Sequence, residues 1–223
     1  MISMIQWLRK VPLFDGMTDE QLERVLQIAT KRTLSAGTVL FREKEPGDRF
    51  YVILHGSIKI YNRSSSGEEK VLTALADGES FGELALLDGR PRSATAQTLE
   101  RTMLLEISSD SFMGLLREHF DMVRCILKEL SRRQRATNEH VNDLTFLDDR
   151  TRILKNLILL ANKHGRREGS SIIFRVSLNY EELSRMAGVS ISALRESLLE
   201  LEIKGILLIR DQEYRLQLDK LRA

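Results

Sequence analysis

Residues 81–96, "FGELALLDGRPRSATA", place two opposite charges in a mostly apolar stretch. Glu83 follows Gly82, and Arg92 lies nine positions after Glu83, beside Ser93. An arginine presents two parallel donors to a phosphate and stays charged when it is buried. A glycine lets the backbone approach an anion closely, and the amides of a short helical turn that begins at Glu83 point toward it. These residues predict a site in which Arg92 and Ser93 hold a phosphate.

Glu83 needs a different partner, because a phosphate repels a carboxylate. A ribose hydroxyl donates a hydrogen bond and suits it, so a ligand with one phosphate charge and a ribose explains the set. The alternative is an internal ion pair between Glu83 and Arg92. A buried pair of this kind is often no more stable than apolar replacements, so its presence needs a reason.

The stretch belongs to a region, about 33–107, in which short β-type runs alternate with turn residues. The runs are 38–41, 50–54, 57–62 and 102–107, and Gly or Pro-Gly-Asp sequences separate them. Several short strands at such spacing predict a sandwich or roll. A helix with Thr18 as its N-cap is expected before them, over 19–29.

From about 109 to 146 the pattern is helical. Its apolar positions alternate spacings of four and three, with two polar interruptions: Val123, Leu127, Leu130, Gln134, Thr137, Val141 and Leu144. So narrow a stripe is typical of a helix that pairs with a second copy of itself. The alternative is one long amphipathic helix packed on its own domain.

The C-terminal segment contains two short apolar faces separated by Gly188-Val189-Ser190. Asn179 with Glu182, or Ser177, can cap the first helix, and Ser190 can cap the second. The runs 206–210 and 214–218 then predict a hairpin. Helix, tight turn, helix and hairpin are the parts of a winged helix-turn-helix. An ordinary three-helix bundle with a hairpin is the alternative.

In a helix-turn-helix, the first residues of the second helix meet base edges in the major groove. The outward side chains there are Ile191, Ser192, Arg195, Glu196 and Leu199. Arg195 offers the fork that reads guanine, Ile191 can touch a thymine methyl, and Ser192 can donate or accept. Phosphate contacts are expected from backbone amides and from Ser177, Arg185, Ser190 and Arg210. Residues 148–223 carry 14 Lys and Arg against 11 Asp and Glu, which weakly favours a polyanion partner.

The rest of the composition excludes several classes of protein. A single cysteine, Cys125, rules out an intrachain disulfide, an iron–sulfur cluster and a four-thiolate zinc site. The four histidines are too scattered to argue for haem ligation: His55, His119, His140 and His164. With no export signal, no membrane-length apolar run and no catalytic constellation, we expect a cytoplasmic protein that is not an enzyme, has no metal and has no membrane partner.

The stretch 81–96 resembles the phosphate-binding cassette of cyclic-nucleotide-binding domains. With the long helix and winged helix-turn-helix, the chain resembles the cyclic-AMP receptor protein (CRP/FNR) family over about residues 8–220. The resemblance implies an α+β fold with three parts. They are a jelly-roll-like cyclic-nucleotide-binding β-roll at 1–108, a long dimerisation helix at 109–147, and a winged helix-turn-helix DNA-binding domain at 148–223.

The resemblance also implies the roles of individual residues. The ligand-binding positions are Gly82, Glu83, Leu84, Ala85, Arg92, Ser93, Ala94, Thr137 and Asn138. Thr137 matches the position that contacts the adenine, whereas Asn138 replaces a serine that the partner subunit supplies in cyclic-AMP-responsive members. Some members of the family have threonine directly after the cassette arginine, and others have serine. Ser93 resembles the pattern of the members that bind cyclic AMP, and it disfavours cyclic GMP.

The second helix of the helix-turn-helix departs from the family. "SISALRE" (190–196) stands where the family usually has Ser-Arg-Glu-Thr-Val-x-Arg, so the common family operator is not expected. The DNA-binding positions are Ser177, Arg185, Ser190, Ile191, Ser192, Arg195 and Glu196.

The resulting expectation is a homodimeric transcription regulator gated by cyclic AMP. It binds a palindromic operator in double-stranded DNA, and RNA polymerase is a further candidate partner. One alternative is a family regulator that is constitutive or senses another metabolite. The other is a cyclic-nucleotide-binding module whose C-terminal domain contacts protein instead of DNA.

Overall fold

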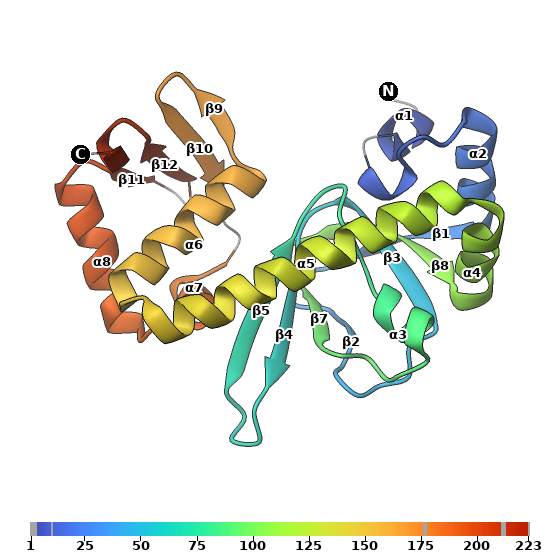
Figure 1. Ribbon diagram of the computed structural model, residues 1–223, viewed down its shortest axis with the longest axis horizontal. Helices are drawn as coiled ribbons and strands as arrows, with labels where there is room; N and C mark the ends of the chain where they lie inside the picture. The colour runs from blue at the N-terminus through green and yellow to red at the C-terminus, as the bar shows by residue number, and fades with distance from the viewer. Residues whose placement is uncertain (1–3, 10, 176–177, 211–212, 223) are drawn as a thin grey trace. The chain divides into compact units, whose positions relative to one another are not determined.

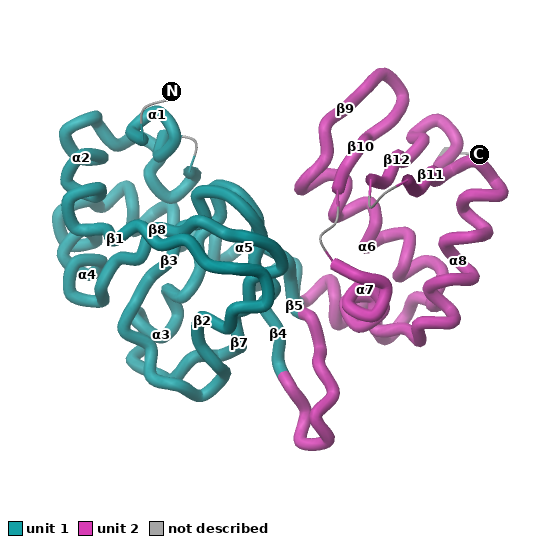
Figure 2. Tube along the Cα trace, turned by 180° about the vertical axis from the view of Figure 1, so that it is seen from behind, with its two compact units in different colours: residues 1–62, 72–137 teal, residues 63–71, 138–223 magenta. Residues whose placement is uncertain are grey.

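The computed structural model describes residues 4–9, 11–175, 178–210 and 213–222. The chain divides into two compact units, shown in different colours in Figure 2. Unit 1 comprises residues 1–62 and 72–137, and unit 2 comprises residues 63–71 and 138–223. The chain crosses between the units within two strands at 62–63 and 71–72, and within one helix, α5 (Phe120–Phe146), which is continuous across the division at 137–138 (Figure 1).

Two four-stranded sheets form the β-roll, with strand orders β1-β8-β3-β6 and β2-β7-β4-β5 within the described part of the chain. The strands are β1 (Ala29–Leu34), β2 (Val39–Phe41), β3 (Arg49–His55), β4 (Ile58–Arg63), β5 (Glu69–Leu75), β6 (Ser80–Phe81), β7 (Thr95–Thr98) and β8 (Thr102–Ser108). The four runs expected as strands are confirmed as β2, β3, β4 and β8. Sequence patterning missed β1, because four of its six side chains are exposed and it shows no apolar alternation.

Strand β3 supplies two hydrophobic cores at once. Phe50, Val52 and Leu54 point to the core that the helices cover, whereas Tyr51 and Ile53 point between the two sheets. Side chains alternate faces along a strand, so a strand buried on both faces reads as a continuous apolar run.

Helices cover the outer face of the first sheet: α1 (Met4–Leu8), η1 (Pro12–Phe14), α2 (Asp19–Ile28), α4 (Ser109–Glu118) and the first turns of α5. The expected N-cap of α2 is confirmed, because Thr18 accepts a hydrogen bond from the Gln21 amide in a capping box. The helical run expected from 109 to 146 is interrupted at His119, which separates α4 from α5.

The 81–96 stretch forms β6, a short helix and the start of β7. The short helix, α3 (Glu83–Asp88), lies between Gly82 at φ 87° and Gly89 at φ 68°. Both glycines therefore adopt the left-handed conformation that other residues avoid.

Unit 2 contains a helix-turn-helix and a four-stranded sheet ordered β11-β12-β10-β9 within the described residues. Its elements are α6 (Asp149–His164), β9 (Arg166–Glu168), β10 (Ser171–Arg175), α7 (Tyr180–Ala187), α8 (Ile191–Ile203), β11 (Leu207–Arg210), β12 (Glu213–Gln217) and η2 (Lys220–Arg222). Sequence patterning treated 167–171 as a loop. The structure instead makes it the turn and flanks of a β9–β10 hairpin.

Candidate functional sites

Arg92 is held in place by two backbone segments, the cassette itself and the start of β3. Its guanidinium donates to the Gly82 carbonyl and the Arg49 carbonyl, each at 2.8 Å. The guanidinium also lies over the Phe41 ring, 4.1 Å from the ring centroid, where a cation–π attraction operates. The backbone of Arg92 is fixed in turn, since its amide donates to the Glu45 carbonyl.

This guanidinium is a buried cation with no carboxylate partner. Arg92 is 4% exposed, forms no ion pair within the described residues, and leaves its buried Nε atom without an acceptor. Burial lowers the pKa of Arg92, and this is opposed by Tyr51 and then by the negative charges of Asp48, Glu83 and Glu45. Because an uncompensated buried charge is costly, the arrangement is suited to an anion that supplies the missing partner.

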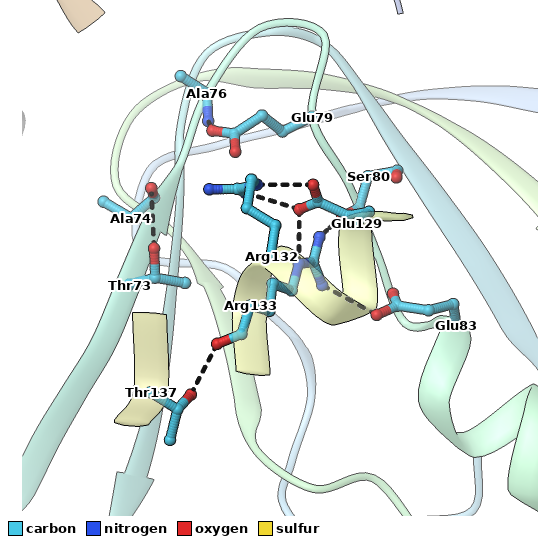
Figure 3. Close-up of polar contacts among 10 residues, drawn as sticks. All are labelled: Thr73, Ala74, Ala76, Glu79, Ser80, Glu83, Glu129, Arg132, Arg133 and Thr137. Carbon is cyan, nitrogen blue, oxygen red and sulfur yellow. Dashed lines mark hydrogen bonds and ion pairs between the residues drawn. The ribbon is translucent and has the colours of Figure 1, made fainter. Parts of the chain in front are cut away.

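Glu83 does have an ionic partner, and it comes from α5. Arg133 donates to the Glu83 carboxylate at 2.9 Å, and Glu83 is 5% exposed (Figure 3). The same guanidinium donates to the Ser80 carbonyl at 2.7 Å. An internal pair between Glu83 and Arg92 was the alternative from sequence. The structure pairs Glu83 with Arg133 instead.

Glu129 links this pair to a larger network on α5. It accepts from both Arg132 and Arg133, at 2.7 to 2.8 Å (Figure 3). Burial alone raises the pKa of Glu129, but the hydrogen bonds from the two arginines outweigh it and lower that pKa to about 2. The sequence reasoning missed Arg133 and Glu129. The sequence did contain a signal for them. Glu129 and Arg133 are four positions apart, the spacing of an ion pair on one helix face, and Arg133 lies one turn before Thr137.

The other positions expected to bind the ligand differ in burial. Ala85 and Ala94 are buried, and Leu84 is exposed. Ser93 is exposed, and its hydroxyl makes no hydrogen bond within the described residues. Thr137 is exposed on α5, and its hydroxyl donates to the Arg133 carbonyl of its own helix at 3.0 Å. Asn138 is the next exposed residue of α5.

In unit 2, the local signals of the helix-turn-helix are confirmed. Asn179 and Glu182 form a capping box at α7, and Gly188 ends α7 at φ 69°. Ser190 accepts from the Ala193 amide at the start of α8. Leu194, Leu198 and Leu201 bury one side of α8. The residues expected to face outward are all exposed: Ile191, Ser192, Arg195, Glu196 and Leu199.

One of the expected phosphate contacts, Arg185, is already paired within unit 2. Arg185 is engaged by two carboxylates, Glu181 at 2.7 Å and Glu69 at 3.3 Å. Lys70 donates to the Arg185 and Met186 carbonyls, so residues 63–71 also contact the last turn of α7 within unit 2. Ser177 lies outside the described residues.

Comparisons with known proteins identify related sequences and folds. Residues 31–119 match the cyclic nucleotide-binding domain. The chain is 29% identical over 198 residues to a CRP-like cAMP-activated global transcriptional regulator of Mycobacterium tuberculosis, covering 89% of this chain and 88% of that protein. It is 28% identical over 195 residues to the cyclic AMP receptor protein of Thermus thermophilus, covering 87% of each. Among solved structures, the c-di-GMP-responsive global regulator CLP of Xanthomonas campestris superposes with a TM-score of 0.74 at 25% identity, over 90% of this chain and 99% of that one.

A β-roll with a phosphate cassette, a long helix and a winged helix-turn-helix together define a class of bacterial transcription regulators that contain a cyclic nucleotide-binding domain. Within that class, the chain is similar to regulators described as CRP-like and as cyclic AMP receptor proteins. No helix in the described ranges is long and apolar enough to cross a membrane.

Proposed function

We propose that this chain is a homodimeric transcription regulator that binds double-stranded DNA under the control of a cyclic nucleotide, with cyclic AMP as the first candidate. In this proposal, residues 1–108 hold the ligand, 109–147 form the dimer contact and 148–223 bind an operator. Arg92 and Ser93 bind the phosphate, and Glu83 accepts from the ribose 2′-hydroxyl.

The observation that carries the ligand proposal is the buried, unpaired guanidinium of Arg92. Its terminal nitrogens are oriented by two carbonyls, and Nε has no acceptor. Carbonyl oxygens orient a guanidinium but do not neutralise it. A singly charged phosphodiester supplies both the charge and the acceptor oxygens that this group lacks.

Arg133 extends the proposed site on the ribose side. It holds the Glu83 carboxylate in one orientation, so a lone pair remains directed for a donor from the ligand. The 2′-hydroxyl of a ribose is such a donor, and it can bind while the ion pair between Glu83 and Arg133 stays intact.

A second candidate follows from the same ion pair. Because Arg133 already satisfies Glu83, this carboxylate is stable without any ligand. That favours a family regulator that does not use a cyclic nucleotide. Its β-roll would be structural, and the regulator would be constitutive or would respond to another metabolite. The two candidates make opposite predictions for nucleotide binding.

Titration calorimetry of cyclic AMP, cyclic GMP and cyclic di-GMP against the wild type tests both candidates. Arg92→Ala is the informative variant, and Arg90→Ala is its matched control, since Arg90 lies two positions away and is exposed. We expect saturable cyclic AMP binding that Arg90→Ala retains and that Arg92→Ala weakens at least about 100-fold, the effect of losing a charged partner in a buried site.

Each outcome decides between the two candidates. Loss in Arg92→Ala alone supports the phosphate role. Absence of heat with all three nucleotides assigns Glu83 and Arg92 to a structural role and favours the second candidate. Equal loss in both arginine variants contradicts the role given to Arg92.

A further inference from the structure

The outward face of α8 carries an unusual combination of side chains. Ile191, Arg195 and Leu199 follow one another at intervals of four, so they form a row along the helix. Ile191 is 40% exposed and Leu199 is 58% exposed, although both are branched apolar residues. Leu194 and Leu198 are buried on the adjacent side of α8, whereas the members of the row are exposed.

Several charged side chains near the row form ion pairs with one another. Lys204 and Arg150 both pair with Glu200, at 2.7 and 3.0 Å. Arg195, in contrast, makes no hydrogen bond or ion pair within the described residues, and it is exposed. The row therefore presents one unpaired guanidinium between two apolar side chains.

We propose that α8 reads its operator chiefly through thymine methyl groups, with Ile191 and Leu199 as specificity-determining residues on either side of a guanine read by Arg195. This inference rests on the DNA binding proposed above. In the major groove the thymine C5-methyl is the apolar group, and guanine presents the two acceptors that an arginine fork matches.

The spacing of the row fits this assignment. Four residues of a helix advance about 6 Å, and stacked bases are about 3.4 Å apart along a strand. Neighbouring members of the row therefore lie about two base steps apart. A half-site core of about five base pairs is expected, with thymines near both ends and a guanine between them.

Ile203 provides a matched apolar control further along α8. It is 78% exposed and apolar, and it continues the row at the next interval of four. It lies about 18 Å along the helix from Ile191, near the C-terminal end of α8. Since the N-terminal part of such a helix contacts the bases, Ile203 is expected to stay outside the groove.

The test begins with selection of duplexes from a random library by the full-length protein, with and without cyclic AMP. Each thymine of the selected consensus is then replaced by deoxyuridine, which removes the C5-methyl alone. We expect a loss of about fourfold in wild-type affinity for each contacted methyl, from the free energy of burying one such group. Ile191→Ala and Leu199→Ala should each become insensitive to deoxyuridine at one position, whereas Ile203→Ala should behave like the wild type.

The outcomes separate this inference from the function it rests on. Failure to retain any duplex, at low salt and with or without ligand, contradicts DNA binding itself. A selected consensus whose affinity changes less than twofold at every deoxyuridine contradicts only the methyl readout. Unchanged selectivity in both Ile191→Ala and Leu199→Ala also overturns the inference, and it points to a protein contact at this face.

Discussion

At the residue scale, two buried charges of opposite sign in unit 1 have different kinds of partner. Glu83 is neutralised by Arg133, whereas among the described residues the Arg92 guanidinium donates to carbonyl oxygens and lies over aromatic rings without an ion pair. Gly82 links the two, because its carbonyl accepts a hydrogen bond from Arg92 and Glu83 is the next residue in the chain. The position of one backbone segment therefore controls both charges.

The substitution Gly82→Ala tests whether this backbone segment positions both charges. The added Cβ would lie 2.9 Å from Nη1 of Arg92 and 3.0 Å from the Arg49 carbonyl, at φ 87°. Gly82→Ala should therefore lower the free energy of unfolding and also weaken nucleotide binding. Gly89→Ala is the control, since its φ of 68° imposes a similar strain of about 1–2 kcal/mol but no atom lies within 4 Å.

Urea unfolding and nucleotide titration of both variants provide the measurement. Gly89→Ala should lose stability and keep its ligand affinity, whereas Gly82→Ala should lose both. Equal ligand affinity in the two variants would show that the placement of Arg92 does not depend on Gly82.

The pKa of Glu129 predicts a pH dependence of stability. Because this pKa is lowered from 4.5 to about 2, the ionised network stabilises the fold fully above pH 4.5 and loses that contribution as the pH falls from 4.5 toward 2. Glu129→Gln should therefore be less stable than the wild type by about 1 kcal/mol at pH 7, a value reduced for partial exposure. The difference should shrink in acid.

Chemical unfolding at several pH values between 7 and 3 measures this difference. Glu23→Gln is the control, since Glu23 is exposed in unit 1 and makes no ion pair within the described residues. A deficit of Glu129→Gln that stays constant down to pH 3 would contradict the proposed ionisation of Glu129.

At the element scale, α5 has one face against the roll and another that is exposed and apolar. Met122 and Ile126 are buried, whereas Leu127 and Val141 are 58% and 56% exposed. The exposed residues follow the alternating spacing of four and three that typifies a helix pair. A single chain leaves this stripe in water, which supports a second copy as its partner.

Leu127→Glu places a charge in the stripe and should shift the protein from dimer to monomer, because an unpaired charge is costly in an apolar contact. Lys128→Glu is the control, since Lys128 is the next residue and points away from the stripe. Sedimentation velocity should show a dimer for the wild type and Lys128→Glu. A dimer in Leu127→Glu would assign the contact elsewhere.

At the scale of the whole molecule, the proposal requires that ligand binding to unit 1 changes DNA binding by unit 2. Helix α5 and strands β4 and β5 each continue from one unit into the other, and Thr137 is the last residue of α5 that belongs to unit 1. Such coupling is a free energy of about 1–3 kcal/mol between two sites, and it is reciprocal.

We therefore expect cyclic AMP to raise affinity for a selected duplex by about 5- to 150-fold, and that duplex to raise cyclic AMP affinity by the same factor. Fluorescence anisotropy measures the first effect, and calorimetry with free and DNA-bound protein measures the second. Arg90→Ala should respond like the wild type. Ligand binding that leaves DNA affinity unchanged would contradict gating.

The sequence alone determined features that depend on neighbouring residues. The strands with apolar runs, the caps at Thr18, Asn179 and Ser190, and the turn at Gly188 were all predicted and are confirmed. Each is set by forces that act within a few positions of the chain: alternation of side chains, satisfaction of terminal amides and the freedom of glycine. The sequence also predicted that Glu83 and Arg92 would lie near one another.

Only the tertiary structure decided which partner each of these groups has. Arg133 is 50 positions from Glu83, and Arg49, whose carbonyl accepts from Arg92, is 43 positions away. Strand β1 and the β9–β10 hairpin were likewise missed, since pairing with another strand defines them more than their own pattern does. A buried charge or an unpatterned strand is stabilised by whichever distant segment packs against it, and local spacing does not specify that segment.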